Sequence, residues 1–255
     1  MTVTPDDTLT IDRSWWSWSG VHGGLLASLM VDRLHADHPG RRLRGLSVGF
    51  LAAADERPIA LETTVRPAGR TTVFADLLAV QGDDAVATAQ AVLGVNRTGP
   101  AYTDLPAPAA PPPDGLETLG FPVELVPFAQ HLEFRPISAA RPFAGGDSAD
   151  LVAWVRLHDG RPLTPATVTL LLDAFAPALY AVLRDPVPIP TVQMNVQLTP
   201  HLDGGPVEGW ALGRIHTRHA GDGWAVDDST IWSASGELLG LCRQTRRVIV
   251  PAERG

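Results

Sequence analysis

The sequence predicts an α+β fold made of two tandem copies of one unit, an apolar helix followed by four antiparallel strands. Three observations support this prediction. Small residues at positions 20–24 lead into a helical pattern of apolar residues, and four strand-like runs separated by turn residues follow it. The same order returns after a segment rich in proline and alanine. We therefore expect one unit over residues 1–99, an extended linker over 100–127 and a second unit over 128–255.

The composition is that of an acidic protein with a single cysteine. Of the 255 residues, 45% are hydrophobic, which is enough for a sizeable core. The formal net charge of -8 argues against nucleic acid or an anionic membrane as the main partner. Cys242 has no second cysteine to pair with, which fits a reducing compartment. Residues 4–7 are polar and acidic, unlike a signal peptide, and no apolar run approaches a membrane span. We expect a cytoplasmic protein.

The first unit is expected to begin with a strand over residues 8–18 that runs into the glycine turn. The helix after the turn has apolar residues at helical spacing, namely Leu25, Leu26, Leu29, Met30 and Leu34. Pro39 and Gly40 stop it. The four strands that follow are expected over residues 43–52, 59–66, 71–81 and 85–95.

The second unit repeats this plan after two further strands, expected over residues 130–135 and 150–156. Thr164 and Pro165 are a good N-cap and first helical residue, and the apolar pattern predicts a helix from there to Leu183. The four following strands are expected over residues 189–198, 207–217, 224–232 and 238–250. The last hairpins of the two units align in outline, with residues 87–90 in the place of 241–244.

The start of the first helix is a candidate binding element. Gly23 and Gly24 leave the first N–H groups of the helix uncovered, so these groups can meet a carbonyl oxygen or an anion at close range. His22 stands directly before them. The scattered histidines and the lone cysteine offer no metal-ligand set, and neither a phosphate-binding glycine loop nor the nucleophile elbow of a serine hydrolase is present. We expect neither a metal nor another cofactor.

Two long apolar helices, each followed by an antiparallel meander, resemble the double hotdog fold, and in particular the acyl-CoA thioesterase II (TesB-like) family. The resemblance covers roughly residues 12–96 and 150–250. In that fold the sheet wraps the helices and the two units share one continuous sheet. The resemblance implies an acyl-CoA thioesterase, with acyl-CoA as its partner. Exposed sheet edges and the habit of the family favour a homo-oligomer.

TesB-like enzymes order the attacking water with an aspartate, a threonine and a glutamine, and the matching residues here are Asp173, Thr191 and Gln244. A lone carboxylate on an apolar helix costs several kcal/mol to bury unless it is paired or solvated, which also singles out Asp173. The resemblance implies that Asp173 accepts a proton from water while Thr191 and Gln244 hold that water. It also implies that helix-terminal N–H groups, here of Gly23 and Gly24 next to His22, bind the substrate oxygen.

Three alternatives stay open at this point. The TesB-like pattern has an Asp-His pair after the threonine where Val192 and Gln193 stand here, which leaves room for a non-catalytic acyl-CoA or lipid-binding hotdog protein. His22 also resembles the first residue of the His-Gly-Gly motif of other hotdog thioesterases; paired with Asp32, it would suit a second site or a hydratase or dehydratase. Asp173 can instead cap a neighbouring backbone.

Arg243, Arg246 and Arg247 are interpreted either as contacts to the CoA phosphates or as part of a solvated edge strand.

Overall fold

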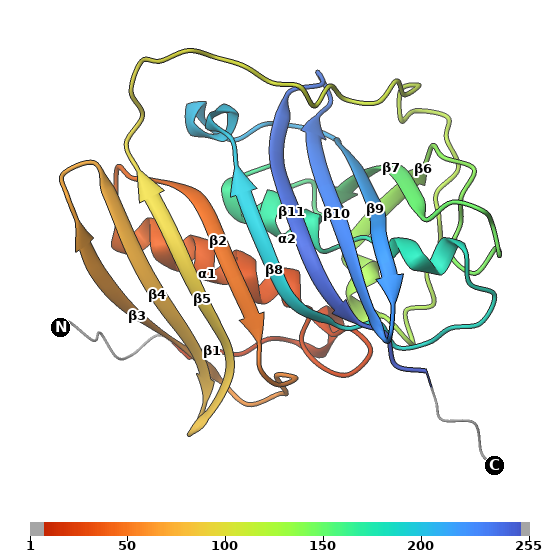
Figure 1. The fold of residues 1–255 in the computed structure, drawn as a ribbon, viewed down its shortest axis with the longest axis horizontal. Helices are drawn as coiled ribbons and strands as arrows, with labels where there is room; N and C mark the ends of the chain where they lie inside the picture. Colours follow the sequence, from red (N-terminus) through yellow and green to blue (C-terminus); the bar gives the residue numbers. More distant parts are fainter. Residues whose placement is uncertain (1–7, 251–255) are drawn as a thin grey trace.

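Residues 8–250, which the computed structural model describes, form one antiparallel sheet of eleven strands with two α-helices (Figure 1). The acidic residues 4–7 noted above lie outside the described residues. The first unit comprises β1 (Thr8–Leu9), α1 (Gly23–Asp37), β2 (Arg42–Phe50), β3 (Ile59–Ala68), β4 (Thr72–Gln81) and β5 (Asp84–Gly94). The second unit comprises β6 (Leu132–Pro136), β7 (Asp150–Leu157), α2 (Pro165–Leu172), β8 (Thr191–Leu198), β9 (Ala211–Gly221), β10 (Trp224–Ser233) and β11 (Leu238–Arg247).

The strand order confirms the predicted repeat. Across the sheet the strands lie in the order β1-β3-β4-β5-β2-β8-β11-β10-β9-β7-β6. The strand after each helix, β2 or β8, is therefore the innermost strand of its unit. These two strands pair antiparallel, with Ser47 opposite Asn195, and join the two halves into one continuous sheet. The protein is an α+β double hotdog.

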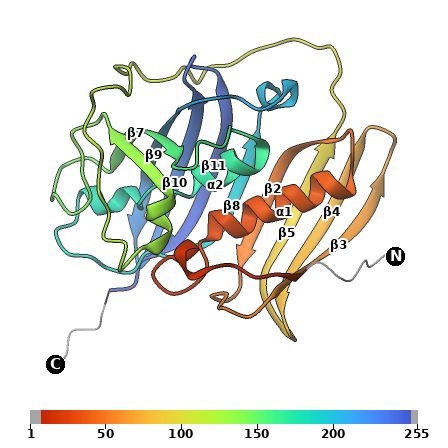
Figure 2. The same ribbon diagram turned by 180° about the vertical axis from the view of Figure 1, so that it is seen from behind.

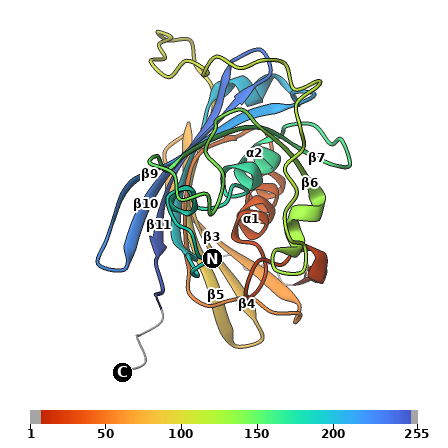
Figure 3. The same cartoon turned by 90° about the vertical axis from the view of Figure 1, so that its right-hand side faces the viewer.

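The sheet curves around the two helices, which lie side by side on its concave face (Figures 2 and 3). One side of α1 is fully covered, since Ala27, Met30, Val31 and Leu34 have no measurable exposure. Burying such side chains stabilises the fold by roughly 1.5–3 kcal/mol each for the larger ones. Among the described residues, no helix has the length and apolarity needed to cross a membrane.

The predicted strand over residues 8–18 is wrong beyond its first two residues. Only β1 pairs with the sheet, and Arg13–Trp15 form a 3₁₀ helix instead. The physical reason lies in Asp12, whose side chain accepts a hydrogen bond from the backbone N–H of Ser14 at 2.8 Å and caps this turn. The chain is thereby redirected toward the start of α1.

The predicted helix from Thr164 to Leu183 is also wrong in its second half. Its start is confirmed, because the Thr164 side chain accepts from the backbone N–H of Thr167 at 3.1 Å. The helix ends at Leu172, however, and Asp173 is its C-cap rather than an interior residue. Pro177 explains the end: it has no N–H to give to the carbonyl four residues earlier, that of Asp173, and its ring crowds that carbonyl.

The predicted alignment of the two last hairpins is out of register. Gln90 was expected in the place of Gln244, but Gln90 is exposed while Gln244 is fully buried. The two side chains thus lie on opposite faces of the sheet, because side chains alternate between faces along a strand. Residues 100–126 contain no helix or strand and run over one end of the sheet (Figure 1). The division at residues 100–127 stays a prediction.

Candidate active site

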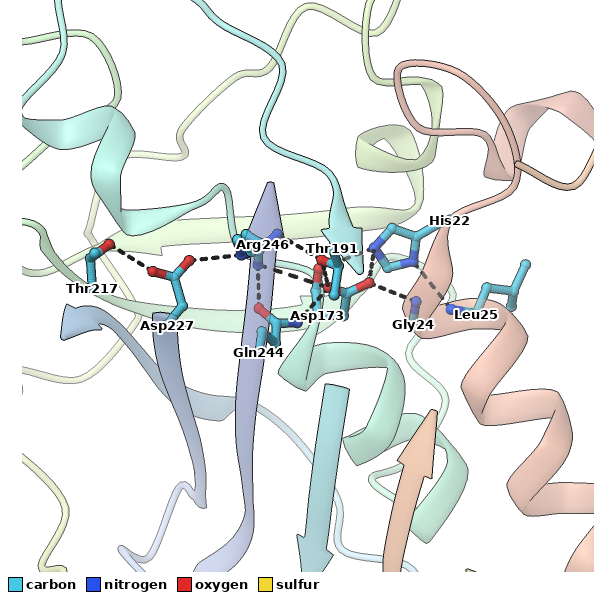
Figure 4. Close-up of polar contacts among 9 residues, drawn as sticks. All are labelled: His22, Gly24, Leu25, Asp173, Thr191, Thr217, Asp227, Gln244 and Arg246. Carbon is cyan, nitrogen blue, oxygen red and sulfur yellow. Dashed lines mark hydrogen bonds and ion pairs between the residues drawn. The ribbon is translucent and has the colours of Figure 1, made fainter. Parts of the chain in front are cut away.

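The carboxylate of Asp173 lies where the end of α2 meets the start of α1 (Figure 4). Its side chain is only 6% exposed. Oδ1 accepts from Nε2 of Gln244 at 2.6 Å and, in a longer contact of 3.4 Å, from the hydroxyl of Thr191. Oδ2 accepts from the backbone N–H of Gly24 at 2.7 Å. The structure therefore brings the three predicted catalytic residues together, and it adds a backbone donor from the other unit.

The early end of α2 frees a further group for the site. Because Pro177 has no N–H, the carbonyl of Asp173 lacks the helical donor it would otherwise have. Nε2 of His22 lies 3.1 Å from this carbonyl oxygen and 3.5 Å from Oδ2 of the same residue. Both polar ends of Asp173 thus face the first turn of α1.

His22 is the N-cap of α1, and its ring is neutral. Nδ1 accepts a hydrogen bond from the backbone N–H of Leu25 at 3.2 Å, so the ring proton belongs on Nε2, which faces the carbonyl of Asp173. Burial lowers the pKa of His22, although the Asp173 carboxylate opposes this shift. The ring also stacks on Phe128 with 4.0 Å between centroids. Both nitrogens of His22 are therefore engaged by protein atoms.

The close approach of the two helices requires glycine at two positions. A Cβ atom added to Gly24 would lie 2.8 Å from Cβ of Asp173 and 2.9 Å from the carbonyl oxygen of Leu170. A Cβ added to Gly23 would lie 2.8 Å from the ring of Phe50 and 3.2 Å from Oδ2 of Asp173. The small residues noted in the sequence thus admit the carboxylate to the end of the helix, where the helix dipole favours negative charge.

A second group of charged residues lies directly behind this site. Nη2 of Arg246 donates to Oε1 of Gln244, and its Nη1 donates to the hydroxyl of Thr191 at 2.8 Å. Nε of Arg246 forms an ion pair with Oδ2 of Asp227 at 2.7 Å, while Oδ1 of Asp227 accepts from the hydroxyl of Thr217, also at 2.7 Å. Arg246 is 3% exposed and Asp227 has no exposure.

This group corrects the interpretation of the three arginines as a solvated edge. β11 lies between β8 and β10 in the interior of the sheet. Arg243 points outward to an ion pair with Asp228, whereas Arg246 points inward. Sequence reasoning missed the roles of Arg246 and Asp227, although one signal was present: residues two apart on a strand share a face, so Gln244 and Arg246 had to lie on the same side.

Asp32 does not join His22 in the structure. It lies nine residues after Gly23 on a continuous helix, which corresponds to roughly 14 Å along the axis, and its side chain is exposed. The carboxylate beside His22 is that of Asp173. A second or alternative site built on His22 and Asp32, including a hydratase of that design, is thereby contradicted. Among residues 8–250 no three His, Cys, Asp or Glu side chains are grouped so as to hold a metal ion.

Two family models match the chain along most of its length. The model of the acyl-CoA thioesterase N-terminal domain matches residues 12–94, and that of the C-terminal domain matches residues 103–248. A relative in Mycobacterium tuberculosis, an uncharacterized protein, is 26% identical over 272 positions that cover 95% of this chain and 90% of the relative. The matched regions include every residue of the site just described.

Solved structures agree on the fold. A conserved protein of unknown function with a hot dog fold from Alicyclobacillus acidocaldarius is 27% identical, with a TM-score of 0.88, over 98% of this chain and 97% of that chain. An acyl-CoA thioesterase II from Mycobacterium marinum is 19% identical, with a TM-score of 0.75, over 98% and 97% of the two chains. At that identity the second likeness shows the fold alone. On the evidence of the two domain models, the chain belongs to the acyl-CoA thioesterase family.

Proposed function

We propose that this protein hydrolyses an acyl-CoA to the free acid and CoA, with a water molecule activated by Asp173. One observation carries the proposal: the Asp173 carboxylate is 6% exposed yet held by Gln244 at 2.6 Å and by Gly24 at 2.7 Å. A carboxylate fixed in this way is oriented as a general base must be.

The carboxylate has hydrogen-bonding capacity left for a water molecule. An ionised carboxylate accepts about four hydrogen bonds, and one short protein donor occupies each oxygen of Asp173. Thr191 is half-buried, and its hydroxyl lies 3.4 Å from Oδ1 of the carboxylate. Nε2 of Gln244 has a second hydrogen besides the one given to Asp173. We assign the attacking water to a position within hydrogen-bonding reach of these three side chains.

The reaction then needs no covalent intermediate. Asp173 takes one proton from the water as its oxygen bonds to the thioester carbonyl carbon, giving a tetrahedral oxyanion. This species expels the CoA thiolate as the carbon–sulfur bond breaks, and Asp173 returns the proton to the sulfur. The free acid and CoA leave.

The oxyanion is assigned to the N–H of Gly23. The N–H of Gly24 donates to Asp173, and the N–H of Leu25 donates to His22. Among the described residues, the N–H of Gly23 donates to no acceptor. Removing one oxyanion-hole donor from another hydrolase costs about 2.7–4 kcal/mol of transition-state stabilisation. This sharpens the predicted substrate-binding role of residues 22–24: Gly23 meets the substrate, while His22 and Gly24 hold the base.

A non-catalytic acyl-CoA binder is the second candidate, and a specific observation favours it. Each oxygen of Asp173 already has a protein donor, which is also the arrangement expected of a residue whose sole role is to tie α2 to α1. In that case the acyl-CoA partner remains but turnover is absent. Cytoplasmic location and assembly into a homo-oligomer are predictions common to both candidates.

The deciding experiment measures thiol release from acyl-CoAs ranging from acetyl to stearoyl, with one aromatic ester. Wild type is expected to hydrolyse some of them, and Asp173→Asn, which keeps the shape of the side chain, is expected to lose at least ~100-fold in kcat. Asp32→Asn is the matched control, an exposed carboxylate of the other helix, and is expected to keep the wild-type rate. Acyl-CoA binding without turnover by wild type would establish the binder instead, and an active Asp173→Asn would move the base elsewhere.

A further inference from the structure

We propose that Arg246 is a positioning residue for this hydrolysis, setting the orientation of Gln244 and Thr191 without touching the substrate, and that Asp227 holds Arg246 in place for that task. The inference rests on the proposed function. It is carried by a single guanidinium whose three nitrogens each face a different side chain (Figure 4).

The first step concerns the two ends of the Gln244 amide. Asp173 needs the NH₂ end of Gln244, because an ionised carboxylate has no proton to give. A glutamine side chain can also present its oxygen, which would repel the carboxylate. Nη2 of Arg246 donates to Oε1 of Gln244 and so fixes the oxygen away from Asp173. Gln244 has no exposure, so bulk solvent does not compete with Arg246 for the amide oxygen.

The second step concerns the single proton of the Thr191 hydroxyl. Nη1 of Arg246 donates to this oxygen at 2.8 Å and so fills a lone pair of the hydroxyl. The hydroxyl's own proton then points away from Arg246 and is free to be donated. Oδ1 of Asp173 lies 3.4 Å away in the direction of that proton. Arg246 thus makes Thr191 a donor toward the carboxylate and the water beside it.

The third step concerns what keeps Arg246 from pairing with the base itself. Nη2 of Arg246 lies 3.9 Å from Oδ1 of Asp173, whereas its Nε lies 2.7 Å from Oδ2 of Asp227. Thr217 in turn holds Asp227. Asp227 therefore anchors the guanidinium one side chain back from Asp173. Without this anchor Arg246 would move onto Asp173 and occupy the oxygen that the water needs.

Stability alone does not account for this arrangement. Taking a charged pair out of water costs several kcal/mol per ion, and well-packed apolar residues often serve a core equally well. The planar fork of Arg246 donates to two partners in fixed directions and forms an ion pair with a third, while a lysine offers one point charge. The expectation is that Arg246→Lys retains the charge and the fold but not the orientation.

The experiment compares Arg246→Lys and Arg246→Met with Arg135→Met. Arg135 is the matched control because it also pairs with a buried carboxylate, Glu133, elsewhere in the sheet. Both Arg246 variants are expected to lose roughly tenfold to 100-fold in kcat with KM changed less than about twofold, as misplaced catalytic groups do. Arg135→Met is expected to be less stable but as fast as wild type. Because Arg246 acts in part through Gln244, Arg246→Lys combined with Gln244→Ala should cost less than the two single losses added together.

A second readout does not depend on turnover. The side-chain amide NMR signals of Gln244, identified by their loss in Gln244→Glu, are expected to shift in Arg246→Lys and to stay in place in Arg135→Met. Unchanged signals, or a wild-type kcat in folded Arg246→Lys while Asp173→Asn is inactive, would overturn the role of Arg246 and leave the proposed function intact. If wild type hydrolyses no acyl-CoA, the proposed function fails, and the amide signals still decide whether Arg246 orients Gln244.

Discussion

The two helices of this double hotdog occupy equivalent places but contribute opposite ends to the site. α1 runs for 15 residues from two glycines, and its first turn supplies N–H groups. α2 begins with a capped Thr164–Pro165 start, runs for 8 residues and ends at the carboxylate of Asp173. The equivalent stretch of α1 continues past Asp32, which stays exposed. A repeated fold has therefore produced one composite site rather than two.

The inner faces of the two half-sheets also differ, in the number of buried polar side chains that they carry. In the first unit Gln81 is the buried strand residue with a polar side chain, and it bonds the backbone of the loop between β2 and β3 at Asp55 and Arg57. In the second unit several buried polar residues lie on neighbouring strands: Asp227, Ser229, Gln244 and Arg246. Apolar packing thus dominates one unit, while the other carries the charged groups that orient the base.

Gly24→Ala is the change expected to break this composite site most severely. The added methyl group would lie 2.8 Å from Cβ of Asp173, a rigid position, so the helices must separate. We expect a loss of about 1–3 kcal/mol in the free energy of unfolding and about 100-fold in kcat, because small displacements of a catalytic group are costly. Urea unfolding and thiol release measure the two effects.

Gly99→Ala is the matched control for that variant. A Cβ at Gly99 meets nothing within 4 Å, so stability is expected to change by less than about 0.5 kcal/mol. If Gly24→Ala were as stable and as active as Gly99→Ala, the close approach of α1 to Asp173 would have no functional meaning.

Pro177→Ala should make α2 more like α1. Alanine restores an N–H that can bond the carbonyl of Asp173 in competition with His22, so α2 is expected to lengthen and turn the carboxylate. The expected results are a gain of helical circular dichroism and a loss of roughly tenfold in kcat. Pro186→Ala, an exposed proline after the same helix, should change neither. An unchanged rate alongside a longer helix would show that the site does not depend on the early end of α2.

The smallest effect is expected in the pH dependence of stability, and His22→Asn tests it in acid. Burial lowers the pKa of His22 from its ordinary value of 6.5, so below that pH the unfolded chain binds a proton that the folded protein does not. The free energy of unfolding therefore falls as the pH drops from about 6.5 toward the lowered pKa, by at most about 1.4 kcal/mol per pH unit. Asparagine keeps the N-cap but does not titrate, so the variant should have a smaller slope than wild type, the remainder coming from His35 and His131, whose pKa values burial also lowers. Equal slopes in urea unfolding of both proteins would contradict a buried neutral His22.

Much of this arrangement could be predicted from the sequence. The glycine turn, the helical periodicity and the turn residues between strands are local signals, and they predicted the tandem units and most strands. The resemblance pointed to Asp173, Thr191 and Gln244. In the structure the hydroxyl of Thr191 lies 3.4 Å and the amide nitrogen of Gln244 lies 2.6 Å from Oδ1 of Asp173.

The errors arose where local patterns compete or where distant segments meet. The apolar pattern continued past Asp173, but Pro177 outweighed it by removing one helical donor. The inward direction of Arg246 followed from its spacing to Gln244, yet the interior place of β11 depends on its pairing with both β8 and β10. Asp227 acquires its role only through its ion pair with Arg246. Long-range pairing of this kind leaves no local signal.

The central claim is that Asp173 activates water rather than attacking the thioester itself. A single turnover in ¹⁸O-labelled water, with enzyme in excess over acyl-CoA, tests it most directly through the masses of the released acid and of the Asp173 peptide. The account predicts an acid that carries one label after the first turnover and an unlabelled peptide. An unlabelled acid with the label in the Asp173 peptide would mean that the carboxylate attacks the carbonyl carbon, and would contradict the account.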